Sequence, residues 1–265
     1  MVRPRPPAIS PGLRSDLVRL IASASTPGRE SALVRPCPTA ETPIVAGVPL
    51  TNEAKDKYIA PDMSVFTAAT IEDLHGVSPE PDGWVASFWL NSIFRGRFEG
   101  PLNTTLLNFL RRTHAAFQEY AVARTHTLAY LANPDAPRQY FAAMTHWEIF
   151  LSQAYQAHCL LDMGQKNMFK QRDGSVLERL SLLYGRAKHV EKAITTAGQL
   201  PENGTLPVWL TNDGLRSTDS HLTFGEIVNI LRGLAHCAEA MEDPLTMREK
   251  LLAIAAESVE HTEAG

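Results

Sequence analysis

The sequence predicts an all-α fold, a four-helix bundle that follows a proline-rich N-terminal arm. Apolar residues recur every three to four positions over four long segments between residues 102 and 243, which is the period of a helix with one buried face. Capping residues, glycines and prolines fall at the ends of these segments. Nine of the 18 prolines lie within residues 1–50, which separates this stretch from the helical part.

The first two predicted helices run from about Leu102 to Ala132 and from about Arg138 to Met163. Asn133-Pro134 ends the first helix, and Gly164 ends the second. Each has one apolar face: Leu106, Leu110, Phe117, Ala121, Leu128 and Leu131 in the first, and Tyr140, Met144, Trp147, Leu151, Ala154 and Leu161 in the second.

The third and fourth predicted helices each begin at a capping box, Ser175 with Glu178 and Thr223 with Glu226. Gly198 ends the third helix, and the fourth stops before Pro244. The apolar faces contain Val176, Leu180, Leu183, Ala187, Val190 and Ile194 in the third, and Phe224, Ile227, Leu231, Leu234, Ala235 and Ala238 in the fourth.

The other segments connect or flank the bundle, whose domain is predicted to span residues 102–260. Residues 1–50 are expected to form an extended or partly disordered arm with a short helix at Ser15–Ser23. Residues 51–101 are expected to form a connecting segment with short helices, one of them at Asn52–Tyr58. A long loop over residues 199–222 joins the third and fourth helices, with an extended piece at Leu206–Leu210. A last short helix is predicted at Thr246–Ala256.

The composition excludes several classes of protein. A net charge of -4 over 265 residues argues against a surface that is positively charged throughout, as nucleic-acid binding over the whole surface would need. Three scattered cysteines exclude a disulfide framework and a cysteine zinc site, and they suit a reducing compartment. No stretch reaches the ~20 apolar residues that span a bilayer. We therefore expect a cytoplasmic protein without a membrane partner.

The motifs of the common cofactor enzymes are missing from this sequence. It has no glycine-rich nucleotide loop, no Gly-x-Ser-x-Gly and no His-Glu-x-x-His. Glu72 and His75 have the spacing of one metal-binding pair, but they lack the partners of a di-metal helical site. We predict neither a cofactor nor a metal.

Two polar residues fall within predicted apolar faces. Arg124 lies on the first helix and His158 on the second, with Glu148 at the edge of the second face. One hypothesis is a polar site between the helices, where Arg124 binds an anion and His158 donates or accepts a hydrogen bond. The alternative, which we favour, is structural: Glu148 or a backbone carbonyl satisfies Arg124, and His158 is a core residue.

The third helix carries a basic flank beside its apolar face. The flank consists of Arg179, Arg186, Lys188 and His189. Such side chains bind phosphate in nucleotides and RNA, so they are candidate ligand-binding residues. The alternative, which we favour, is an ordinary solvated helix edge.

A second candidate site precedes the fourth helix. His221 could act as a general base, and Arg216 could stabilise a phosphorane-like transition state. The intervening Ser217 to Ser220 are equally typical of turns and caps, and we favour that interpretation.

Two segments resemble the HEPN superfamily of four-helix domains. His146–Ala157 (HWEIFLSQAYQA) resembles the long second helix of that family, and Leu177–His189 (LERLSLLYGRAKH) resembles the third, which commonly ends in a tyrosine followed by Lys-His. The resemblance covers residues 102–243. It implies a dimer. Members of this superfamily that cleave RNA without a metal carry an Arg followed, several positions later, by a His. In this sequence only Arg216 and His221 have that spacing, so the resemblance implies that these two residues would be catalytic in a nuclease.

These observations predict a non-catalytic HEPN-like module that binds a protein partner, a second copy of itself, or an anionic ligand such as RNA or a nucleotide. The binding surface would combine the third-helix flank with the Trp209 loop. The alternative is a metal-independent endoribonuclease, toxin-like, that uses Arg216 and His221 or the third-helix flank. A second alternative is a structural subunit whose arm docks onto an assembly.

Overall fold

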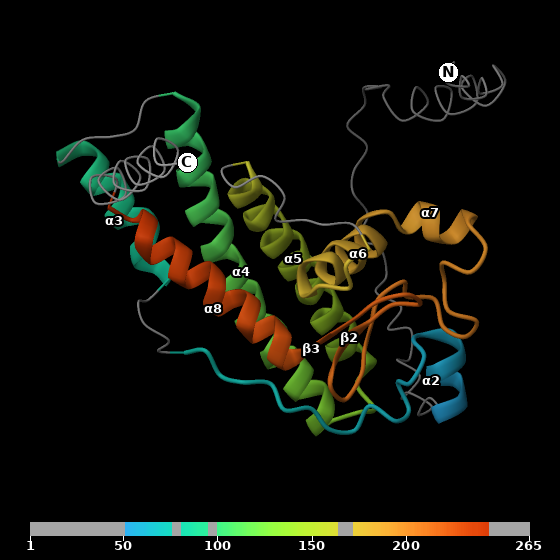
Figure 1. Cartoon of the computed structure of the whole chain (residues 1–265). Helices are drawn as coiled ribbons and strands as arrows, with labels where there is room; N and C mark the ends of the chain where they lie inside the picture. Colours follow the sequence, from blue (N-terminus) through green and yellow to red (C-terminus); the bar gives the residue numbers. More distant parts are fainter. Residues whose placement is uncertain (1–50, 76–80, 95–99, 164–171, 244–265) are drawn as a thin grey trace, which may run out of the picture. The chain divides into compact units, whose positions relative to one another are not determined.

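The computed structural model describes residues 51–75, 81–94, 100–163 and 172–243, which belong to one compact unit beginning at Pro49 (Figure 1). Over these ranges the chain forms seven helices and three short strands. The protein is therefore mostly helical, as the sequence predicts. The proposed arm and the predicted helices at Ser15–Ser23 and Thr246–Ala256 lie outside the described residues.

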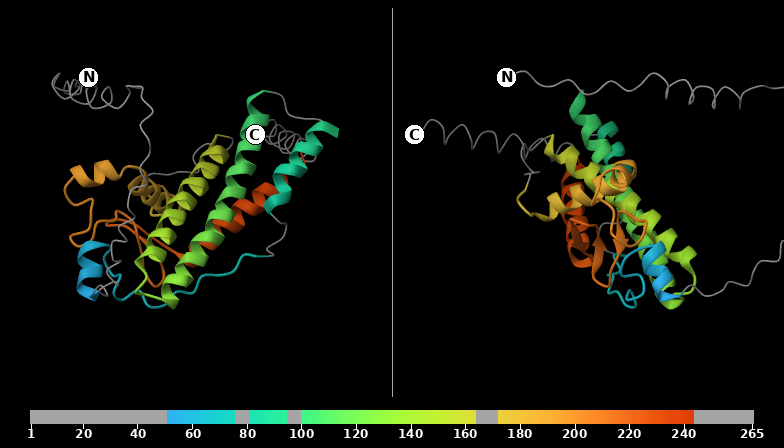
Figure 2. Two further views of the ribbon diagram at one scale, coloured as in Figure 1. Left: turned by 180° about the vertical axis from the view of Figure 1, so that it is seen from behind. Right: turned by 90° about the vertical axis from the view of Figure 1, so that its right-hand side faces the viewer.

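A long helical hairpin forms the centre of the fold. Helices α4 (Pro101–Ala132) and α5 (Pro137–Asp162) lie side by side and antiparallel, and each begins with a proline in its first turn (Figure 2). These bounds confirm the first two predicted helices. Helix α8 (Phe224–Met241) packs against both members of the hairpin, and α6 (Val176–Lys188) packs against α5.

Helix α3 (Pro81–Phe94) also belongs to the bundle, although the sequence placed it in a connecting segment. It packs against α4 and α8 at the end where α4 begins (Figure 1). Trp84 and Phe88 are buried, and the Trp84 ring meets Phe117 of α4 edge-on at 5.5 Å. At the opposite end, α2 (Asn52–Tyr58) is capped by Thr51 and tied by the Lys55 ammonium to Asp135 at the α4–α5 turn.

The buried face of α4 departs from the prediction in its second half. Ala121 is exposed, and Leu128 and Leu131 are only half-buried. The residues that face the core there are Tyr120, Ala123, Thr127 and Tyr130. Two of the polar groups in this core are hydrogen-bonded: the Tyr120 hydroxyl donates to the Glu72 carbonyl at 2.8 Å, and Trp147 donates to the Thr127 hydroxyl at 3.0 Å.

The predicted third helix is two helices. Helix α6 ends at Lys188, because His189 leaves the helical conformation with φ -112° and ψ 49°. The short helix α7 (Val190–Thr195) follows, and it leaves Val190 41% and Ile194 67% exposed. The continuous apolar stripe to Ile194 was therefore wrong beyond Ala187.

The predicted long loop contains a small antiparallel sheet. Strands β1 (Trp209–Leu210), β2 (Gly214–Arg216) and β3 (His221–Thr223) pair in sequence order. Leu210, Leu215 and Leu222 align across the three strands and are fully buried. The sheet covers part of the helical core. This burial explains why the segment that joins the third and fourth predicted helices is rich in apolar residues.

Both predicted helix caps are present, but they differ. Thr223 and Glu226 form a complete capping box at α8. At α6 the Ser175 hydroxyl accepts from the Glu178 backbone, while the Glu178 carboxylate accepts from the backbone of Arg172 and Gly174 instead of Ser175.

None of the described helices combines the length and the apolarity that crossing a membrane requires.

Candidate functional site

Arg124 and His158 do not share a site. Facing pairs along the hairpin, Arg112 with Gln153 and His126 with Gln139, show that positions on α4 and α5 run in opposite directions. His158 therefore lies opposite the first turns of α4, roughly 25 Å along the helix axis from Arg124 at 1.5 Å per residue. The hypothesis of a joint polar site between these two residues was wrong.

Arg124 instead fixes the segment that precedes α3. Its Nε donates to the Ile71 carbonyl at 3.0 Å, and a terminal nitrogen lies 3.2 Å from the Asp73 carboxylate. Arg124 therefore has the structural role that we favoured, in which a backbone carbonyl satisfies its guanidinium. Glu148 is not a partner of Arg124. His158 is buried in α5, and burial lowers the pKa of its imidazole to about 4, so the ring is neutral near pH 7.

Arg179 is bound to a carboxylate of the α8 cap. Its guanidinium contacts both oxygens of Glu226, at 3.0 and 2.5 Å, and also donates to the His221 carbonyl at 2.8 Å. Arg179, followed by the hydrogen bonds from Thr223, lowers the pKa of Glu226 to about 2. This Arg joins α6 to β3 and α8, so its planar donor set is already occupied.

Arg186, on the same flank, pairs with Asp219 of the β2–β3 turn at 2.5 Å and lowers the pKa of that carboxyl. With His189 and Lys192 it lines a shallow pocket of about 200 Å³ between α6 and α7. His189 lies 3.3 Å from Glu191. Arg186 and His189 of this pocket are therefore each paired with a nearby carboxylate, which reduces its positive charge.

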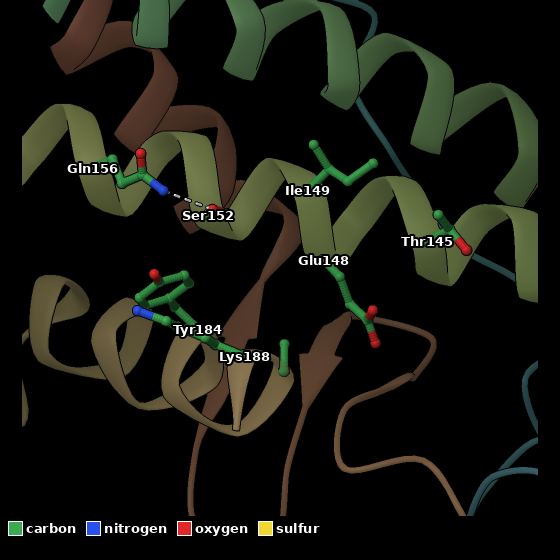
Figure 3. A pocket seen from close by; sticks show the side chains of 8 residues that line it. Thr145, Glu148, Ile149, Ser152, Gln156, Tyr184 and Lys188 are labelled. Carbon is green, nitrogen blue, oxygen red and sulfur yellow. Dashed lines mark hydrogen bonds between the residues drawn. The ribbon is translucent and has the colours of Figure 1, made fainter. Parts of the chain in front are cut away.

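Lys188 faces a different groove, between α5 and α6 (Figure 3). Its ammonium lies 5.4 Å from the centre of the Tyr184 ring, which stacks on Tyr155 of α5 at 4.5 Å. The groove encloses about 480 Å³ and is lined by Thr145, Glu148, Ile149, Ser152, Gln156, Tyr184, Ala187 and Lys188. The basic flank thus divides between two sides of α6 and forms no single site.

The structure brings Arg216 and His221 together. They are direct partners across strands β2 and β3, so their side chains share one face of the sheet. His221 Nε2 lies 3.2 Å from the Asp213 carboxylate, whose pKa is lowered first by the Thr211 hydroxyl and then by His221. Arg216 is exposed, and no side-chain partner for it lies within the described part of the chain.

The Trp209 loop is not available as a binding surface. Trp209 is 4% exposed, and its neighbours Val208 and Leu210 are fully buried. Its apolar character reflects packing onto the core, so it gives no support to a dimer. The expectation of a binding surface that includes this loop was wrong.

Helix α3 carries a row of exposed apolar side chains that sequence reasoning did not identify as a binding surface. Trp89, Leu90, Ile93 and Phe94 are between 49% and 80% exposed. They follow the i, i+1, i+4, i+5 spacing of one helix face, opposite the buried Trp84 and Phe88. The signal was present in the sequence, because the segment from Trp84 to Phe94 is apolar on all sides.

Comparison of the chain with models of protein families, with curated proteins and with solved structures gave no match.

Proposed function

We propose that this protein is a non-catalytic helical binding module that works as a homodimer, with the outer face of α3 as the contact between copies. The exposed row formed by Trp89, Leu90, Ile93 and Phe94, named here the α3 stripe, is the observation that carries the proposal. A helix that is apolar on two opposite faces needs a second partner to cover the outer one.

The size and chemistry of the α3 stripe favour a second copy as the occupant. Its four side chains are half to four-fifths exposed, so they offer roughly 500 Å² per copy and about 1,000 Å² in a dimer, the lower limit for a specific interface. No charged residue belongs to the stripe. Two copies related by a twofold axis therefore meet without like-charge opposition.

The test is the oligomeric state of the full chain, measured by light scattering over a hundredfold range of concentration. We expect a dimer for the wild type and a monomer for Ile93→Glu, which places a charge in the centre of the stripe. Ile194→Glu is the matched control, because Ile194 is also well exposed, 67% against 56% for Ile93, but lies on α7. A wild type that stays monomeric, or an Ile93→Glu variant that stays dimeric, would disprove the α3 contact.

One observation favours a second candidate function, a metal-independent endoribonuclease. The pairing of Arg216 and His221 across β2 and β3, with Asp213 bonded to His221, provides a cation and an oriented base on one face. Arg179 and Arg186 contribute less to this alternative, because both are paired with carboxylates. The HEPN resemblance stays a prediction that supports either function.

The nuclease is tested with a mixed RNA pool in EDTA. Cleavage that is lost in His221→Ala and retained in His189→Ala would establish the second candidate, since both variants lose an exposed or half-exposed histidine. Absence of cleavage by the folded wild type would reject it.

The second alternative, a structural subunit whose arm docks onto an assembly, is tested separately by asking whether the assembly still forms when residues 1–50 are removed.

A further inference from the structure

The groove between α5 and α6 contains a carboxylate without a partner. Glu148 follows the fully buried Trp147 on α5, and its carboxyl extends into the groove beside α6 (Figure 3). No hydrogen bond or ion pair joins Glu148 to any of the described residues, Lys188 of the same groove included. Burial raises the pKa of this carboxyl.

An uncompensated charge in a partly buried place is unfavourable, so proteins seldom keep one without a role. Lys188 would be the obvious partner, yet its ammonium lies over the Tyr184 ring. The other polar groups that line the groove near Glu148 are the hydroxyls of Thr145 and Ser152 and the amide of Gln156, which donates to Ser152 at 2.9 Å. None of them can neutralise a carboxylate.

An aromatic ring, Tyr184, forms part of the α6 wall of the groove. Tyr184 stacks on Tyr155 of the facing helix at 4.5 Å, with 21° between the ring planes. The volume of about 480 Å³ lies within the range of small-molecule sites. The groove thus offers the Glu148 carboxylate and hydroxyl oxygens along α5, and the Tyr184 ring on α6, with the Lys188 ammonium beside that ring.

We propose that this groove binds a ligand that carries a primary ammonium or guanidinium group. The cation pairs with the Glu148 carboxylate, and a remaining N–H group donates to the hydroxyl oxygen of Thr145 or of Ser152, which lie one turn before and one turn after Glu148 on α5. The hydrocarbon part of the ligand lies against the Tyr184 ring. Such a cation can come from a free amine or from a Lys or Arg side chain of a peptide, and the same contacts serve both.

The inference goes beyond the proposed homodimer and does not depend on it, because the groove and the α3 stripe use different helices. The experiment titrates the full chain with two probes, agmatine and a short capped peptide with one central arginine. The peptide with citrulline in place of arginine is the uncharged control. We expect saturable binding with a Kd below about 1 mM for at least one cationic probe, and none for the citrulline peptide.

The decisive variant is Glu148→Gln, which keeps the shape and removes the charge. Binding should weaken at least tenfold in Glu148→Gln and stay unchanged in Glu239→Gln, an exposed acid on α8. Binding of agmatine alone assigns the groove to free amines, and binding of the peptide alone assigns it to protein side chains. Absence of saturable binding, or equal affinity in Glu148→Gln, overturns the proposal.

A second measurement separates a binding role from a structural one. Removing an unpaired, partly buried charge should raise the melting temperature of the unliganded protein, so Glu148→Gln is expected to be more stable than the wild type. A lower melting temperature would show that Glu148 has a structural partner, and this also overturns the proposal. Ile93→Glu should bind the cationic probes as the wild type does, which keeps the two proposals distinguishable.

Discussion

At the scale of single residues, the basic side chains of α6 serve the fold more than they serve a ligand. Arg179 pairs with Glu226 in the first turn of α8, and Arg186 pairs with Asp219 of the β2–β3 turn. Both contacts join parts of the chain more than 30 positions apart, 47 for Arg179 with Glu226 and 33 for Arg186 with Asp219. Charged residues on a helix flank cannot be assigned to ligands until these long-range partners are known.

Glu226 provides a pH-dependent part of the stability. Its pKa is about 2 in the folded protein against an ordinary value of 4.5, so its contribution is present above pH 4.5 and is lost as the pH falls toward 2. Glu226→Gln should lower the free energy of unfolding at pH 7 by about 1–2 kcal/mol, because it weakens the cap and the Arg179 pair.

Urea denaturation of the wild type and Glu226→Gln between pH 7 and pH 2 measures this contribution. The difference between the two proteins should be constant down to about pH 4.5 and then shrink. Glu239→Gln should follow the wild type at every pH, since Glu239 is exposed on the same helix. A difference that does not change with pH would mean that Glu226 acts through shape alone.

At the scale of elements, the small sheet depends on a close approach that only glycine allows. Gly214 pairs with Thr223 at the edge where β2 begins and β3 ends. A Cβ at Gly214 would lie 1.9 Å from the Leu222 carbonyl oxygen and 2.7 Å from the Thr223 Cα, both of them backbone atoms. Backbone atoms cannot move aside without opening the β2–β3 pairing.

We therefore expect Gly214→Ala to lower the free energy of unfolding by about 1–3 kcal/mol. Gly185→Ala is the matched control: Gly185 lies inside α6, and apart from the adjacent backbone of that helix nothing lies within 4 Å of an added Cβ. That change should leave stability equal or raise it by up to about 1 kcal/mol, because alanine favours the helix. Thermal denaturation measures both. Similar effects for the two variants would contradict the close approach.

At the scale of the whole molecule, a hydrogen bond links the sheet to the helical hairpin. The Leu210 backbone amide donates to the Tyr140 hydroxyl of α5 at 3.2 Å, and both residues are fully buried. Tyr140 also packs edge-on against Tyr130 of α4 at 5.2 Å. One side chain thus connects both halves of the hairpin to β1, and this contact holds the segment between α7 and α8 on the core.

Tyr140→Phe should keep the ring packing and leave the Leu210 amide without an acceptor. The expected loss is about 1–3 kcal/mol, the cost of an unsatisfied buried donor. Hydrogen exchange at the Leu210 amide should accelerate in the variant, while exchange within α8 changes only by the global loss of stability. Unchanged protection at Leu210 would show that another group replaces the hydroxyl.

Much of the helical architecture could be predicted from the sequence, because local signals decide it. Proline and the capping residues fix where α4, α5 and α8 begin, and the apolar period identifies them as bundle helices. The break at His189 was missed because the apolar period continues through it, and the phase of α4 was missed because buried Tyr120 and Thr127 are polar residues with distant partners.

The candidate sites could be predicted only in part. By itself, the sequence determined the helices, the caps and the residue types that can carry chemistry, since these follow from interactions within a few positions of the chain. Tertiary structure alone decided that Arg179 is paired with Glu226, that Arg216 faces His221, that Glu148 is unpaired in its groove, and that the outer apolar face of α3 is exposed. Pairing and exposure are relations between distant segments, and no local pattern encodes them.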